Sequence, residues 1–322
     1  MNTFYRNLNI QILFITLIIN TSLSLLSHSN NLEKSYKIIN KQSGLISNCI
    51  YDITQDSKGY IWFASNKGVS IFDGKHYKNI TSSEGLPSND IFSIFEDSQK
   101  RMWIVAGNGK ISYYHNGKLY SEKNTPYLQS IVTNSWIKSI HEDKAGNIWF
   151  GTFIKEIIKI DKKNNIKYFF YPYQKSDLIE SPNGRFISNF FSPNINEIEF
   201  ILSGHGLVKI INDKVITNKK YFGKLEDVTC SYIDKNNIYY CTGKYIKILD
   251  KNLNYISNIE LPKIFKDISI IKNINKNELC ISDGRAVATL NKSTNQIKLI
   301  MNNFGCDKIF QDRDSVFWIN SI

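Results

Sequence analysis

Apolar and polar positions alternate along this chain in short runs, and the runs recur with a period of about 40 residues. In the first repeat, Asp56-Ser57-Lys58-Gly59 and Asp73-Gly74 separate runs of apolar and β-favouring residues. Aspartate can hydrogen-bond its own backbone and glycine can adopt a positive φ, so both favour tight turns. The first repeat therefore predicts four antiparallel strands, at Cys49–Gln55, Tyr60–Ala64, Gly68–Phe72 and His76–Ile80.

One aromatic or apolar residue marks the second strand of each repeat, and successive marks lie 39 to 51 residues apart. A period of this length with four short strands per unit is typical of a β-propeller. We predict an all-β, seven-bladed propeller of four-stranded antiparallel blades, whose last blade is incomplete because the sequence stops soon after the seventh mark. The marks are Trp62, Trp103, Trp149, Phe200, Tyr239, Leu279 and Trp318.

The marking residues are interpreted as packing residues. A blade has two apolar faces and buries them only by stacking against its neighbours, so a large ring on the second strand fills the wedge between blades. Trp136 falls outside this pattern, since it precedes the first strand of the third repeat. Ser35–Ile39 resembles an outer strand, and we expect it to join the last blade and close the ring, leaving a weak seam between the last and first repeats.

The N-terminus predicts export from the cytoplasm. Arg6 precedes a mostly apolar stretch from Leu8 to Ile19, and a serine-rich stretch follows. This order is typical of a secretory signal peptide, and the apolar stretch is short for a membrane span. We predict a signal peptide at 1–27 and a propeller sensor domain at 28–322, located in the periplasm or outside the cell. An uncleaved anchor is the alternative.

Charge and cysteine content change this picture little. The net charge is +11, but the lysines are scattered and no block of five or six basic residues occurs, so no nucleic-acid partner is predicted. Five cysteines are present. Cys230 and Cys241 lie on adjacent predicted strands, where a disulfide is one alternative, and core thiols are the favoured interpretation.

The sequence contains no recognisable catalytic or metal-binding spacing. The five histidines are dispersed, no paired Cys-x-x-Cys or nucleophile elbow occurs, and Gly107-Asn108-Gly109 is interpreted as a hairpin turn. Acidic residues recur in the turns of successive repeats, as at Asp56, Asp97 and Asp143. A catalytic carboxylate is needed once or twice rather than in every blade, so these are interpreted as structural. Neither a catalytic residue, nor a metal site, nor a cofactor is predicted.

The repeat itself resembles a known family. Gly-Leu-x-Ser-Asn, an apolar strand, then Asp-x-x-Gly-x-Ile-Trp-Phe and a Gly-x-x-x-(Phe/Tyr) strand closely resembles the two-component regulator propeller repeat. Gly44–Phe72 and Gly85–Tyr114 match it best, Glu142–Thr152 matches its core, and Asp312–Ser321 matches its first half. The stretch from Phe186 to Ile300 keeps the period but loses most signature residues.

This resemblance implies a periplasmic sensor region. In that family, two such propellers and a sandwich domain precede a transmembrane helix and an output domain, often a histidine kinase, and the best-known members resemble detectors of polysaccharide breakdown products. The chain lacks kinase motifs, so it is expected to be part of a longer sensor or an incomplete gene. The resemblance leaves open a homodimer in the full-length receptor. A secreted propeller enzyme acting on polysaccharide, or a non-catalytic adhesion or assembly scaffold, are the alternative functions.

The predicted ligand face combines two sets of loops. Loops that enter the innermost strands and loops that join second to third strands share one face of a propeller. Lys67, Lys244 and Arg285 occupy nearly the same place in their repeats, so a basic rim favours an anionic oligosaccharide, and Trp136 is the candidate for stacking on a sugar. Charge reversal at Lys67 and Lys244 together is expected to abolish binding of an acidic glycan. The full candidate set is Asn48, Lys67, Asn89, Trp136, His205, Lys244 and Arg285.

Overall fold

The structure of the chain is a computed structural model that describes residues 37–133, 135–153, 156–170, 187–202, 206–217, 228–252, 254–302 and 308–320. It separates into two units, 1–39 and 40–322, and the second carries all the secondary structure given below. Among the described residues, no helix has the length and apolar character that a membrane crossing requires. The predicted signal peptide lies outside the described residues.

Strands dominate the second unit, and its helical elements are short. The first three blades contain β1 (Ile50–Gln55), β2 (Ile61–Ser65), β3 (Gly68–Phe72), β4 (Tyr77–Ile80), β5 (Ile91–Glu96), β6 (Met102–Ala106), β7 (Ile111–His115), β8 (Lys118–Tyr120), β9 (Ile137–Glu142), β10 (Ile148–Thr152), β11 (Glu156–Ile160) and β12 (Ile166–Phe170). The next three contain β13 (Ile187–Phe191), β14 (Glu197–Leu202), β15 (Gly206–Ile211), β16 (Lys214–Thr217), β17 (Val228–Ile233), β18 (Asn237–Thr242), β19 (Tyr245–Asp250), β20 (Tyr255–Glu260), β21 (Ile270–Asn273), β22 (Glu278–Ser282), β23 (Val287–Asn291) and β24 (Ile297–Met301). A last sheet contains β25 (Ile309–Gln311) and β26 (Phe317–Ile319), and the helical turns are η1 (Lys41–Ser43), η2 (Ser82–Glu84) and α2 (Pro126–Gln129).

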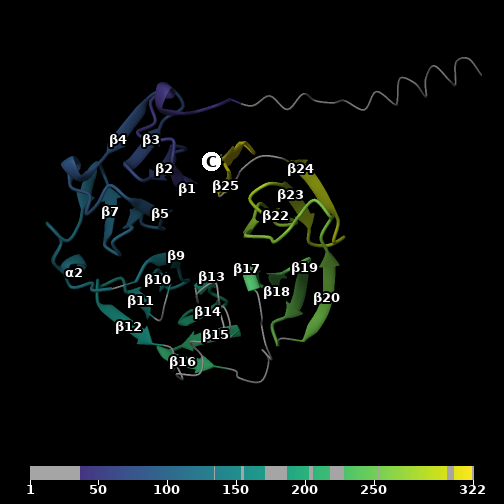
Figure 1. Ribbon diagram of the computed structural model, residues 1–322. Coiled ribbons are helices and arrows are strands. Elements are labelled where there is room, and N and C mark those ends of the chain that lie inside the picture. The colour runs from purple at the N-terminus through teal and green to yellow at the C-terminus, as the bar shows by residue number, and fades with distance from the viewer. Residues whose placement is uncertain are drawn as a thin grey trace, which may run out of the picture. The chain divides into compact units, whose positions relative to one another are not determined.

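Six four-stranded antiparallel blades are confirmed, each formed by strands that pair in chain order (Figure 1). The seventh unit has two paired strands in its described part, so a complete seventh blade is not established. The expected closing strand is wrong for its described residues, because 37–39 form no strand. An outer strand needs a third strand as its hydrogen-bonding partner, and the described part of the last sheet offers none beside β26. Ser35 and Tyr36 lie outside the described residues.

Neighbouring blades are joined by a repeated contact at the turn between first and second strands. The amide and hydroxyl of Ser57 donate to the carboxylate of Glu96 at 2.7 and 2.9 Å, and Ser98 donates likewise to Glu142. The amide of Arg313 donates to Oε1 of Gln55 at 3.0 Å, which is the same contact between the last sheet and blade one. On its other side, Ile309 packs with Cys280 of blade six. The ring is therefore continuous through the two-stranded sheet.

The turn aspartates bind the marking tryptophans. The indole Nε1 of Trp62, Trp103, Trp149 and Trp318 donates to the aspartate six residues earlier, at 2.9, 2.8, 2.7 and 2.7 Å. The other carboxylate oxygen of Asp56 accepts two amides of its own turn. The structural interpretation of these acidic residues is confirmed. Each aspartate accepts hydrogen bonds from its own turn and from the indole of the marking tryptophan.

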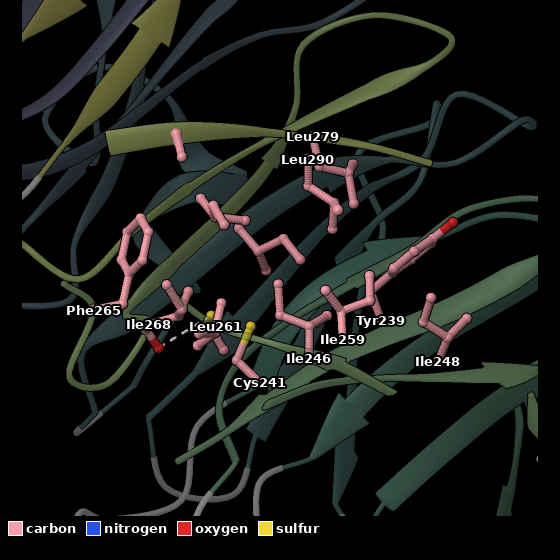
Figure 2. Close-up of a cluster of buried hydrophobic side chains, with 14 of the residues drawn as sticks. Tyr239, Cys241, Ile246, Ile248, Ile259, Leu261, Phe265, Ile268, Leu279 and Leu290 are labelled. Atoms are coloured by element: carbon pink, nitrogen blue, oxygen red, sulfur yellow. Dashed lines mark hydrogen bonds between the residues drawn. The ribbon is translucent and has the colours of Figure 1, made fainter. Parts of the chain in front are cut away.

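A large apolar core lies between blades five and six (Figure 2). It contains Tyr239, the fifth marking residue, together with Ile246, Ile268 and Leu279. Cys230 and Cys241 occupy directly paired positions of β17 and β18, and both are buried free thiols. Burial raises the pKa of the Cys241 thiol, with a contribution from its contact to Cys230. The interpretation of these cysteines as core thiols is confirmed, whereas Cys306 lies outside the described residues.

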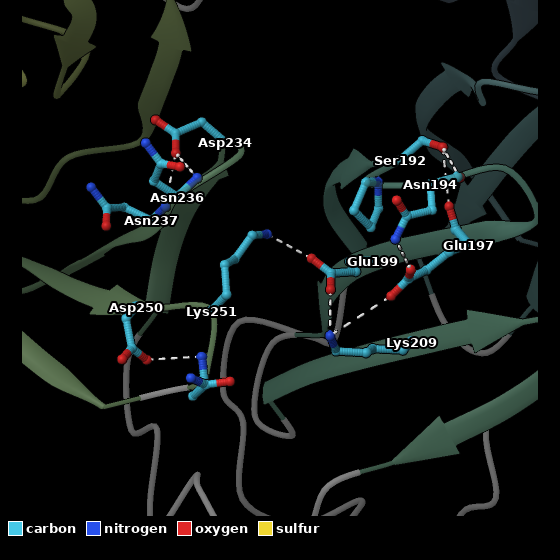
Figure 3. Close-up of polar contacts among 12 residues, drawn as sticks. Ser192, Asn194, Glu197, Glu199, Lys209, Asp234, Asn236, Asn237, Asp250 and Lys251 are labelled. Atoms are coloured by element: carbon cyan, nitrogen blue, oxygen red, sulfur yellow. Dashed lines mark hydrogen bonds and ion pairs between the residues drawn. The ribbon is translucent and has the colours of Figure 1, made fainter.

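Blades four and five are joined by a charged cluster instead of the serine contact (Figure 3). Glu199 on β14 is buried and binds Lys209 of β15 at 2.5 Å and Lys251, which follows β19, at 2.6 Å. The ammonium group of Lys251 also lies 4.2 Å from the ring centre of Phe191. This cluster occurs where the repeats lose their signature residues, so an ion network holds the blades together there.

One partly buried histidine makes the stability of the fold dependent on pH. Burial lowers the pKa of His141 to about 4, and the nearby carboxylate of Asp143 opposes this only in part. The unfolded chain therefore takes up a proton near pH 6.5 that the folded protein takes up only near pH 4. Stability is present in full above pH 6.5 and is lost as pH falls towards 4, by up to about 3 kcal/mol.

We expect His141→Phe to remove most of this pH dependence, because phenylalanine stays neutral beside the ring of Phe190, which His141 stacks on. Urea unfolding at pH 7 and pH 4.5 measures the difference. His76→Phe is the matched control, since the side chain of His76 is 70% exposed. An equal loss of stability on acidification in the wild type and the His141 variant would contradict the assignment.

Candidate ligand-binding face

The loops predicted to form one face do lie against each other in blades one to three. The hydroxyl of Ser47 donates to Asn66 at 2.7 Å, and the amide of Gly107 donates to the carbonyl of Asp90 at 2.7 Å. In blade three, the amide of Phe153 donates to the carbonyl of Trp136 at 2.7 Å. In these blades, the segment before the innermost strand therefore packs beside the hairpin between the second and third strands.

Two predicted site residues have structural hydrogen bonds on this face. Oδ1 of Asn48 accepts from the amide of Lys41 at 2.8 Å, and Oδ1 of Asn89 accepts from Ser82 at 2.7 Å. These bonds tie the entry loop to η1 in blade one and to η2 in blade two. Both asparagine side chains are also exposed, so their amide groups stay accessible to a ligand.

The predicted basic rim is exposed but spread out. Lys67, Lys244 and Arg285 are exposed and belong to blades one, five and six. His205 lies outside the described residues. The rim residues that the structure describes therefore contribute positive charge to one face from separate blades, where salt screens each charge strongly.

A row of aromatic rings crosses the part of this face built by blades one to three. Trp136 is 59% exposed, and its ring lies 5.9 Å from Phe92 and 6.1 Å from Phe153, measured between ring centres. Tyr51 continues the row, with its ring 5.1 Å from Phe92. The structure thus gives Trp136 two aromatic neighbours, Phe92 and Phe153, and places Tyr51 beyond Phe92, in a row that the sequence reasoning did not identify.

Regular bulges place these side chains. β1, β5 and β9 each have a register shift at which one extra residue is inserted, namely Tyr51, Phe92 and Lys138. A bulge re-aims the extra side chain and bends the strand. All three residues lie eleven positions before the marking tryptophan of their repeat. That fixed offset was the available sequence signal, and it was missed.

Charged groups from several blades meet beside the aromatic row. Asp52 of β1 is 7% exposed, and its Oδ1 lies 3.4 Å from Nζ of Lys308, the residue before β25. Its Oδ2 accepts from the hydroxyl of Ser93 at 3.1 Å and from the amide of Ile94 at 3.2 Å. Burial alone would raise the pKa of Asp52, but Lys308, Lys272 and these hydrogen bonds hold it below its ordinary value.

Lys138 belongs to the same group of charges. Burial lowers its pKa first, the positive charge of Lys308 lowers it further, and Asp52 opposes both. The side chain still presents surface to solvent. β9, which carries Lys138, contacts β5 and β13, the first strands of the two neighbouring blades.

A cavity of about 380 Å³ lies elsewhere, between blades one and two at the opposite ends of the strands. Its walls include Asp56, Trp62 and Glu96, whose polar atoms are engaged in the turn and blade contacts described above. Tyr60 is an exposed aromatic in its lining. We favour the face that carries Trp136 as the site, because Asp56, Trp62 and Glu96 in the wall of this cavity are committed to structural contacts.

Among the described residues, no group of three or more histidine, cysteine, aspartate or glutamate side chains has the geometry to hold a metal ion.

The predicted family resemblance is confirmed by comparison with known families. Residues 44–67, 85–108 and 131–153 match the family described as two component regulator propeller. These segments contain the entry loop, the turn aspartate and the marking tryptophan of blades one to three. No protein of curated function matches the chain.

Solved structures share the fold. The extracellular domain of a hybrid two-component system from B. thetaiotaomicron is 21% identical with a TM-score of 0.65, covering 88% of this chain and 40% of that one. The extracellular domain of a one-component system from the same organism is 18% identical with a TM-score of 0.66. The match covers 89% of this chain and 41% of that one. A catalytically inactive virginiamycin B lyase from Staphylococcus aureus, in a structure with quinupristin, is 15% identical with a TM-score of 0.62. The match covers 84% of this chain and 92% of that one. The chain thus spans about 40% of the length of both extracellular domains.

Proposed function

We propose that this chain is the ligand-sensing propeller of a two-component regulatory protein, located outside the cytoplasm and responsive to an oligosaccharide. The repeat match and the fold shared with two extracellular domains support the sensor role. The observation that carries the ligand assignment is the aromatic row in which Trp136 is exposed and its neighbours are partly buried. Apolar ring faces stack on the C–H faces of sugars, and the neighbouring charges and amides supply hydrogen bonds.

The Trp136→Ala variant is expected to bind an oligosaccharide roughly tenfold to a hundredfold more weakly than the wild type, because a central aromatic anchor dominates such interfaces. Isothermal titration of the purified chain against a panel of neutral and acidic oligosaccharides measures the loss. Tyr60→Ala is the matched control, since it removes an exposed aromatic at the opposite ends of the strands. Loss of binding in the Tyr60 variant, with binding kept in the Trp136 variant, would move the site to the cavity between blades one and two.

Two further observations separate the remaining alternatives. Oligosaccharides recovered intact after incubation support a binder, whereas cleavage products would favour a polysaccharide-degrading enzyme. The coding sequence beyond codon 322 tests the regulatory role. We expect it to continue into further repeats, a membrane-spanning segment and an output domain, whereas an immediate stop codon would favour a free-standing binder or scaffold.

A further inference from the structure

One position of the repeat carries a different side chain in each of the first three blades. It lies thirteen residues before the marking tryptophan, and it is Cys49 in blade one, Asp90 in blade two and Trp136 in blade three. Cys49 and Trp136 are exposed, and Asp90 is partly exposed. Equivalent positions of stacked repeats follow one another around the ring. The carboxylate of Asp90 therefore belongs to the same face as the indole of Trp136.

Asp90 differs from the turn aspartates, whose oxygens are engaged by the protein. Asp97 in the same blade accepts from amides of its own turn and from Nε1 of Trp103. Within the described residues, by contrast, Oδ1 of Asp90 is covered by protein and has no hydrogen-bond partner. An unpaired acceptor of this kind is costly, so a structural role does not explain it. The χ2 torsion of aspartate is broad, and the side chain is partly exposed, so either oxygen can turn to a ligand.

The hairpin Gly107-Asn108-Gly109 holds this carboxylate beside the aromatic row. A methyl group on Gly107 would lie 2.7 Å from Oδ2 of Asp90 and 3.2 Å from Cζ of Phe92, so both side chains pack against the bare backbone there. The ring of Phe92 in turn lies 5.9 Å from the ring of Trp136, measured between ring centres. The carboxylate and the exposed indole therefore flank one phenyl ring, where a short oligosaccharide can contact both.

A second polar group lies on the other side of the same hairpin. A methyl group on Gly109 would lie 3.3 Å from the carbonyl oxygen of Ser135. Oγ of Ser135, the residue before Trp136, has no hydrogen-bond partner among the described residues. An ionised carboxylate only accepts hydrogen bonds, whereas a serine hydroxyl donates and accepts. Together these two groups match the hydroxyl groups of a sugar, which also donate and accept.

We propose that the carboxylate of Asp90 accepts hydrogen bonds from hydroxyl groups of the oligosaccharide that stacks on Trp136, with the Ser135 hydroxyl as a second polar contact. Hydrogen bonds to an ionised acceptor are stronger than those between neutral groups. A carboxylate or sulfate on the ligand would meet like charge here, which is unfavourable. This part of the site therefore takes neutral sugars, in contrast to the anionic ligand expected from the rim of Lys67 and Lys244. The inference deepens the proposed function and rests on it.

Isothermal titration with matched sugar pairs tests the charge of the site. Each pair joins a neutral oligosaccharide to the uronate that differs from it only at C6, as galactobiose differs from digalacturonate. The wild type is expected to bind the neutral member more tightly. Asp90→Asn keeps the size of the side chain and removes its charge, so it should bind the neutral member about tenfold to a hundredfold more weakly than the wild type. The uronate should bind this variant at least as tightly as it binds the wild type, which a merely structural role would not produce.

A control and a second variant test the placement of the carboxylate. Asp314→Asn removes the same charge from an exposed turn between β25 and β26, at the opposite ends of the strands, and should change either affinity by less than about threefold. Gly107 has no positive φ, so alanine suits its backbone, and the added methyl group would displace the carboxylate of Asp90. Gly107→Ala is therefore expected to weaken binding of the neutral sugar, and unchanged affinity contradicts the placement.

The outcomes separate this inference from the proposed function. Saccharide binding that is kept in Asp90→Asn but lost in Trp136→Ala supports the sensor proposal and overturns the role of the carboxylate. A wild-type preference for the uronates overturns it as well. Binding of no oligosaccharide by the wild type contradicts both proposals. Thermal unfolding of each variant shows whether the fold is retained.

Discussion

Replacing Trp103 by alanine is expected to lower the free energy of unfolding by about 3–5 kcal/mol. The side chain is fully buried, its ring lies 5.6 Å from Phe150 of the next blade, and its Nε1 donates to Asp97. The substitution removes the ring that fills the wedge between blades two and three. It also takes one hydrogen bond from a buried carboxylate. Urea unfolding followed by circular dichroism measures the loss.

Two further variants separate packing from hydrogen bonding. Trp103→Phe keeps an aromatic ring but loses the indole N–H, so we expect an intermediate cost of about 1–3 kcal/mol. Trp136→Ala is the same substitution at an exposed tryptophan, and it should change stability by less than about 0.5 kcal/mol. A similar cost at Trp103 and Trp136 would show that the wedge position is not what makes the marking residue important.

Replacing Glu199 by alanine is expected to cost about 3 kcal/mol. The carboxylate is 2% exposed and is the shared partner of Lys209 and Lys251. Removal of one partner leaves charges that are partly buried and uncompensated, which is far more costly than the net worth of the ion pair. The pKa of Lys251 is already lowered by burial, with Glu199 opposing that effect. Urea unfolding again gives the measurement.

The burial of the cluster is the property that this prediction depends on. Lys110→Ala breaks a pair of similar length, 2.7 Å to Glu122, but the Lys110 side chain is 51% exposed, so a change below about 1 kcal/mol is expected. The double variant Glu199→Met with Lys251→Met should recover much of the stability lost in Glu199→Ala, because it removes both charges and keeps apolar volume. Equal costs for Glu199→Ala and Lys110→Ala would contradict the assignment.

The repeat architecture was predictable because the hydrogen bonds that define each repeat join residues close together in the sequence. Asp56 and Trp62 are six residues apart, and their hydrogen bond forms within one turn and one strand. The same spacing therefore carries the same geometry into every blade that keeps these residue types. In blade four, Asn194 stands six residues before Phe200, where blades one to three and the last sheet have Asp and Trp. Blade four keeps the period of about 40 residues, because the pairing of its strands needs only alternating apolar side chains.

The face of the candidate site was also predictable, but its composition was not. Trp136 was identified because it broke the repeat, and the structure leaves it exposed. Tyr51 and Phe92 were not identified, because their common offset from the marking tryptophan indicates a bulge only when the strand pairing is known. A closing strand at 35–39 was expected from its apolar pattern alone, and the described residues 37–39 form no strand, because pattern does not guarantee a pairing partner.

The sequence by itself determined the period, the four-stranded blades and the structural role of the turn aspartates, since each depends on contacts within about 40 residues. Only the tertiary structure decided which residues of the first and last repeats meet. Ring continuity places Lys308 beside Asp52 and Arg313 beside Gln55, across nearly the whole length of the chain. Such contacts depend on how the blades stack around the axis, and the spacing within one repeat contains no information about them.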